Sequence, residues 1–115
     1  MDAVVAALTA ANAHPYTLDD IKQMATAPAY YTEVTVSRRF GGERRGGNAS
    51  GSTGWRVTTR AVAKTEENAR EMRRRAASLE DARLGTSTPV VFETEEAIGE
   101  DNDWWSGLTT WTYVT

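Results

Sequence analysis

The sequence predicts an α+β domain in which a single antiparallel sheet of about four strands packs against one long and two short helices. Three observations predict this class. Apolar residues recur at helical spacing near the N-terminus and in the middle of the chain, two stretches between them alternate apolar and polar residues, and the end is rich in β-branched and aromatic residues. The resulting order, α-α-β-β-α-β-β, is typical of one sheet covered by helices. The 115 residues suffice for a single domain, residues 1–115, with one core.

Two short helices are expected at the N-terminal end. The first covers residues 2–12, and the second covers residues 18–25. Thr17 followed three residues later by Asp20 indicates a capping box at the start of the second helix. The apolar stripe of the first helix comprises Val4, Val5, Leu8 and Ala11.

A β-hairpin is expected next, because "YYTEVTVSRRF" and "WRVTTRAVA" both show the period of two of a half-buried strand. One face of the first strand is predicted to carry Tyr30, Thr32, Val34 and Val36, and one face of the second Trp55, Val57, Thr59 and Ala61. Residues 40–54 join the two strands and hold most of the glycines of the chain. We expect them to form a flexible loop, because they are too many for a tight turn and too polar to pack.

The long helix is predicted to begin after Thr65, which can cap it, and to stop at Gly85. Glu66 and Glu67 favour its N-terminal dipole. Two further strands follow, "TPVVFETEEAI" and "WWSGLTTWTYVT". Some of the four tryptophans are expected to lie partly in the core. The apolar stripe of the long helix comprises Ala69, Met72, Ala76 and Leu79.

Composition disfavours most catalytic functions. The chain has no cysteine, which excludes a disulfide, a thiolate nucleophile and a cysteine zinc site, and favours an intracellular protein. Its single histidine, His14, precedes a proline and has no serine in a nucleophile-elbow pattern to activate. No apolar stretch approaches the ~20 residues that cross a bilayer. We therefore expect no catalytic residue, no cofactor, no metal and no membrane partner.

Two segments of opposite charge stand out in a chain of net charge -3. The acidic run lacks the spacing of a calcium-binding loop, and the basic run lacks both a P-loop pattern and a following helix that could hold phosphate. The basic segment, "RRFGGERRGG", contains Arg38, Arg39, Phe40, Arg44 and Arg45. The acidic segment between the last two strands contains Glu93, Glu95, Glu96, Glu100, Asp101 and Asp103.

Three interpretations of the charged segments remain open. The arginines could contact the phosphates of a nucleic acid, which would make the chain a small nucleic-acid-binding module. The basic segment could be only a solvated hairpin tip. In the third interpretation, the basic segment of one subunit meets the acidic segment of another, and such a heterologous contact generates a ring when its rotation closes.

Five segments follow one another along the chain: "PYTLDDIK", "YYTEVTVSRRFGG", "GWRVTTRAVAKTEENAREMRRRA", "TPVVFE" and "TTWTYVT". Their order resembles that of the tail terminator proteins of long-tailed bacteriophages. The resemblance implies a non-enzymatic virion protein of the tail, assembled in the host cytoplasm without a cofactor. It implies a homohexameric ring that caps the head-proximal end of the tail tube and stops tube polymerisation. The implied partners are other copies of the chain, the tail tube protein, a head-completion or connector protein, and DNA passing through the lumen near the basic segment.

Overall fold

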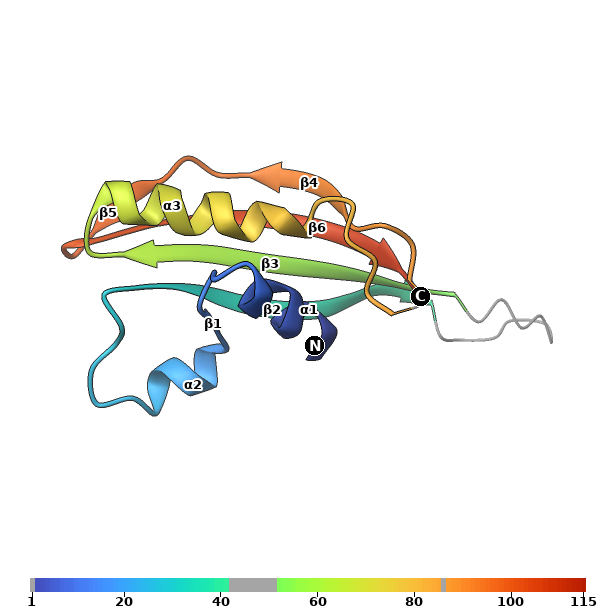
Figure 1. Cartoon of the computed structure of the whole chain (residues 1–115), viewed down its shortest axis with the longest axis horizontal. Helices are drawn as coiled ribbons and strands as arrows, with labels where there is room; N and C mark the ends of the chain where they lie inside the picture. The colour runs from blue at the N-terminus through green and yellow to red at the C-terminus, as the bar shows by residue number, and fades with distance from the viewer. Residues whose placement is uncertain (1, 42–51, 86) are drawn as a thin grey trace.

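The computed structural model describes residues 2–41, 52–85 and 87–115. Over these residues the chain is an α+β domain with three α-helices and a single six-stranded sheet (Figure 1). The strand order is β1-β2-β3-β6-β4, and β5 also pairs with β6. In chain order the elements are α1 Asp2–Ala10, β1 Pro15–Tyr16, α2 Leu18–Lys22, β2 Tyr30–Gly41, β3 Thr53–Ala63, α3 Glu66–Ala76, a 3₁₀ turn Ala77–Leu79, β4 Val91–Glu95, β5 Gly99–Asp101 and β6 Trp104–Val114.

The predicted fold class is confirmed, but the sheet has six strands where about four were expected. The two additional strands are β1, of two residues, and β5, of three residues. Strands this short carry no detectable alternation of apolar and polar residues, so the sequence pattern cannot reveal them. Strand β1 also makes the one parallel pairing among the described strands, with β2, while the others are antiparallel.

The helices start where their caps predict. Thr17 and Asp20 form the expected capping box of α2, and the Thr65 hydroxyl accepts a hydrogen bond from the Asn68 N–H in the first turn of α3. The long helix ends earlier than predicted, because it passes into the 3₁₀ turn after Ala76. Beyond that turn, hydrogen bonds join the backbone of residues 81–82 to Val90, so this part of the chain runs beside the entrance to β4.

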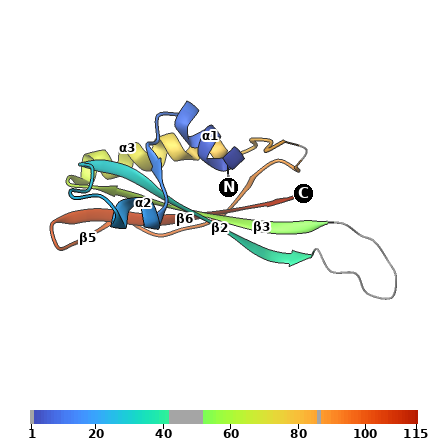
Figure 2. The same ribbon diagram turned by 90° about the horizontal axis from the view of Figure 1, so that it is seen from below.

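The core lies between one face of the sheet and the helices α1 and α3, which lie on the same side of it (Figure 2). Of the two faces predicted for the hairpin, the one that carries Val34 and Val57 is buried in this core. Tyr30 on the same face is nevertheless exposed, and Tyr31 on the other face is buried. Trp111 is the one fully buried tryptophan, and the other three are partly exposed. Residues that form the core include Val4, Leu8, Val34, Val57, Ala76, Leu79, Val90 and Trp111.

Of the loop predicted at residues 40–54, residues 42–51 lie outside the described part of the chain. Its two ends do not form a loop. Phe40 pairs with Gly54 and Gly41 pairs with Thr53, which extends the hairpin beyond the predicted strands. The opposite face of the sheet, away from α1 and α3, carries mostly polar side chains, together with the buried Tyr31 and Val62 (Figure 2). Its side chains include Thr35, Ser37, Arg56, Thr58, Arg60, Thr110 and Thr112.

Candidate interaction surfaces

The described part of the basic segment lies at the end of β2. Arg38, Arg39 and Phe40 are all exposed, and 49% of the Phe40 surface is accessible. The Phe40 ring lies against Gly54, where an added Cβ would overlap the ring. The Arg39 guanidinium lies 5.9 Å from the centroid of that ring, within the range of a cation–π contact. The cluster therefore presents both positive charge and an aromatic surface. Arg44 and Arg45, which the sequence groups with it, lie outside the described residues.

The fold divides the acidic segment between the two faces of the sheet. Glu93 and Glu95 would share a face in a regular strand, but the register of β4 against β6 shifts between Phe92 and Thr94. Such a β-bulge adds one residue and reverses the side on which the following side chains emerge. Glu93 consequently lies on the open face, and Glu95 lies on the face that α3 covers.

Glu93 is held by a bidentate ion pair on the open face. Arg56 donates to it from Nε at 2.8 Å and from Nη2 at 2.9 Å, and the Thr110 hydroxyl donates at 2.8 Å. These hydrogen bonds, with that from Arg56 first, lower the pKa of Glu93 to about 2, and the positive charge of Arg39 contributes a smaller part. The carboxylate is therefore fully ionised at neutral pH and already has a partner within its own chain.

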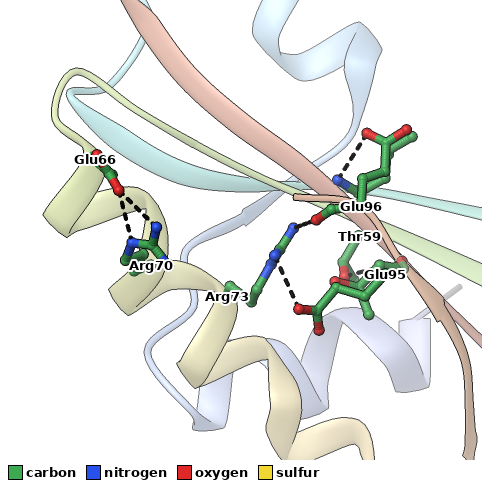
Figure 3. A network of polar contacts seen from close by, with 8 residues as sticks. Thr59, Glu66, Arg70, Arg73, Glu95 and Glu96 are labelled. Atoms are coloured by element: carbon green, nitrogen blue, oxygen red, sulfur yellow. Dashed lines mark hydrogen bonds and ion pairs between the residues drawn. The ribbon is translucent and has the colours of Figure 1, made fainter. Parts of the chain in front are cut away.

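Glu95 takes part in a second network, around Arg73 of α3 (Figure 3). The Arg73 Nη1 donates to the Glu95 carboxylate at 3.1 Å, and its Nη2 donates to the Glu96 carbonyl oxygen at 2.6 Å. Only 17% of the Arg73 side chain is exposed. It fits over the sheet because residue 107 is glycine, where an added Cβ would overlap Nη2 of Arg73. Arg73 thereby connects α3 to the chain just beyond β4.

The remaining acids extend along the same margin of the sheet. Glu100 and Asp101 are exposed in β5, and Asp103 lies in the turn that leads into β6. This turn lies at the opposite end of the long sheet from Arg38, which pairs at the level of Trp55 (Figure 1). The acidic segment is thus a strip along the β4–β5 margin and does not form a single cluster.

Glu80 belongs to the same margin, although the sequence analysis did not single it out. Its Oε2 accepts a hydrogen bond of 2.9 Å from the N–H of Phe92. Glu80 precedes Phe92 by twelve residues, so only the tertiary fold reveals the contact. Two large apolar side chains are exposed here on β4, Val91 with 54% and Phe92 with 45% of its surface accessible.

The other polar groups that the structure describes do not assemble into a site. His14 is exposed, and its ring packs against the Tyr30 ring in a T-shaped arrangement. A shallow hollow of about 570 Å³ lies between the end of α1 and the end of α3, but its Arg74 and Arg75 both donate to Glu71. Among the described residues, no three histidine, aspartate or glutamate side chains gather as metal ligands would. None of the described helices is long and apolar enough to cross a membrane.

Comparison with known protein families and with curated proteins finds no match to this chain. The resemblance to tail terminators therefore depends on the order of the elements and on the residues quoted for it.

Proposed function

We propose that the chain is a structural, non-enzymatic subunit of a homo-oligomeric ring, of the kind that tail terminators form at the head-proximal end of a phage tail tube. The observation that carries this proposal is the distribution of charge over the sheet. Arg38 and Arg39 lie on the margin formed by β2. Glu80, Glu95 and Glu96 lie on the opposite margin, along β4. One subunit thus carries complementary charges on opposite sides.

This distribution favours a head-to-tail contact over a two-fold one. A two-fold contact brings a surface together with its own copy, so the β2 margins would place Arg38 and Arg39 near the same arginines. A head-to-tail contact places the basic margin against the acidic margin, and such contacts close into a ring when the rotation between subunits is an integral fraction of a turn. Opposite charges mainly accelerate and orient the encounter.

The open face of the sheet fits the same proposal. A sheet face without a helical cover normally needs polar side chains, and this one carries threonines with Arg56 and Arg60. We propose that this face borders the water-filled lumen of the ring, through which DNA passes. The tail tube protein and a head-completion protein would lie on the two sides of the ring. The six-fold symmetry is part of the proposal and derives from the resemblance.

The test is the mass of the protein in solution, measured by size-exclusion chromatography with light scattering over a range of concentration and salt. We expect a ring whose assembly weakens when Arg38→Glu and Arg39→Glu are combined, most strongly at low salt. Arg70→Glu combined with Arg74→Glu changes the net charge equally on exposed positions of α3 and should assemble like the wild type. A wild type that is monomeric under all conditions would contradict the proposal.

A mixing experiment tests the head-to-tail geometry. A second variant, Glu80→Arg with Glu96→Arg, makes both margins basic, whereas Arg38→Glu with Arg39→Glu makes both acidic. Each variant alone should assemble poorly, and an equimolar mixture should form rings in which the two alternate. A mixture that assembles no better than its components would exclude an interface between these two margins.

The second candidate is a small nucleic-acid-binding module, which the exposed Arg38, Arg39 and Phe40 favour because cations and an aromatic ring lie together. It predicts that a single-stranded oligonucleotide binds the monomer with an affinity that falls steeply with salt. Fluorescence anisotropy of a labelled oligonucleotide measures this directly. Binding that is weak, or the same for wild type and the Arg38→Glu, Arg39→Glu variant, would exclude it.

A further inference from the structure

The β2 edge offers backbone groups for pairing over much of its length. β1 covers it only at Thr32 and Glu33, and beyond them no strand lies against this edge among the described residues. The Thr32 N–H donates outward, to the His14 carbonyl oxygen at 3.0 Å. Alternate residues of a strand direct their N–H and C=O groups to the same side. The groups of Val34, Val36 and Arg38 therefore also point outward, whereas those of Thr35 and Ser37 pair with β3.

A long edge of this kind is usually blocked, because it can pair with another chain. Here the strand has twelve residues, and its outer half carries the charges of Arg38 and Arg39 and a bulge between Arg38 and Phe40 as deterrents. Those charges repel another β2 edge but attract an acidic one. The occupant should therefore be an acidic strand.

The β4 edge of a second copy runs antiparallel to the β2 edge that it would meet. β2 is antiparallel to β3, β3 to β6, and β6 to β4, so β2 and β4 run in opposite directions within one subunit. When two copies stand side by side in the same orientation, β4 of the first consequently meets β2 of the second as an antiparallel neighbour. All subunits of a ring share such an orientation.

The β4 edge also lies at the matching height. Val91 pairs with Thr112 of β6, Thr112 pairs with Arg56 of β3, and Arg56 pairs with Ser37, so Val91 lies level with Ser37 across the sheet. Glu95 lies level with Val34. β4 therefore stands opposite the part of β2 that β1, at Thr32 and Glu33, leaves free. The start of the β4 edge is covered within the subunit, because residues 81–82 hydrogen-bond to the backbone of Val90, so the junction with β2 would run from Phe92 to Glu95. The two exposed apolar residues of β4, Val91 and Phe92, would be buried at such a junction.

We propose that the β2 edge of one subunit pairs with the β4 edge of the next, so that the sheets of neighbouring subunits join into one continuous antiparallel sheet. This inference rests on the ring proposed above and specifies its interface. Glu80 is placed to regulate the junction, because it covers the N–H of Phe92 in the single subunit. In the ring, Arg38 of the neighbour provides an alternative partner for the Glu80 carboxylate.

The first test is a matched pair of variants, Arg38→Pro and Arg38→Ala. Both remove the same charge, but only proline removes the outward N–H, and proline is tolerated on a strand edge whose N–H faces solvent. We expect Arg38→Pro to raise the concentration needed for assembly at least about tenfold above that of Arg38→Ala. Circular dichroism of both monomers checks that they remain folded. Equal assembly of the two folded variants would overturn the inference.

The second test is hydrogen exchange of the wild type, read at single amides below and above the assembly concentration. The amides of Val34, Val36 and Arg38 should exchange at least about tenfold more slowly in the ring. Those of Thr35 and Ser37, which pair with β3, should be protected in both states.

The outcomes separate this inference from the ring itself. A ring in which the three outward amides still exchange rapidly would leave the proposed function standing and overturn the strand junction. A dimer with protected β2 amides would show that β2 pairs with itself and would exclude β4 as its partner. A monomer at every concentration would overturn both proposals.

Discussion

Replacing Gly107 by alanine should destabilise the chain mainly through Arg73. A Cβ at residue 107 overlaps Nη2 of Arg73, so the guanidinium must move away from Glu95 and from the Glu96 carbonyl oxygen. Two hydrogen bonds that involve a charged group contribute about 1.5 kcal/mol each at the lower end of their range. Alanine regains about 0.5–1 kcal/mol over glycine within a strand. The expected net loss in the free energy of unfolding is therefore about 2 kcal/mol.

The assay is urea unfolding in a double-mutant cycle, at a concentration at which the chain is monomeric. In an Arg73→Ala background the overlap with the guanidinium is absent, so Gly107→Ala should cost less than about 1 kcal/mol. A small cost remains, because the Cβ would also lie 3.1 Å from Cγ1 of Ile98. Gly99→Ala is the matched control, since a Cβ there meets no atom within 4 Å. An equal cost of Gly107→Ala in both backgrounds would refute the reasoning.

Two further predictions concern Glu93 and the cap of α3. The pKa of Glu93 is lowered to about 2, so its ion pair stabilises the fold above the ordinary value of 4.5 and is lost as pH falls towards 2. The difference in melting temperature between wild type and Glu93→Gln should shrink over that interval. Arg56→Ala should raise the NMR titration midpoint of Glu93, and an unchanged midpoint would contradict Arg56 as the main cause of the lowered pKa. Thr65→Ala should lower the free energy of unfolding, measured in urea, by about 1 kcal/mol, whereas Thr65→Ser should keep most of the stabilisation by the cap. Equal losses in the two variants would show that the hydroxyl is not the cap.

Local patterns in the sequence determine the main elements of this protein. The alternation of apolar and polar residues fixes which face of the hairpin is buried, since successive side chains of a strand point to opposite sides, and Val34 and Val57 lie in the core accordingly. The caps at Thr17 and Thr65 are also readable, because their hydrogen bonds reach only three residues along the chain. These features depend on near neighbours in the sequence, so no knowledge of the fold is needed.

The tertiary structure alone decides where the charged segments lie. The sequence presents the acids as one run, but a bulge in β4 sends Glu93 to Arg56 and Glu95 to Arg73, partners that are distant in the chain. The contact of Glu80 with Phe92 and the uncovered half of β2 likewise follow from the order of strands in the sheet. Such contacts depend on which strands become neighbours and in what register, and that choice is made by the packing of the whole core rather than by any local stretch of residues.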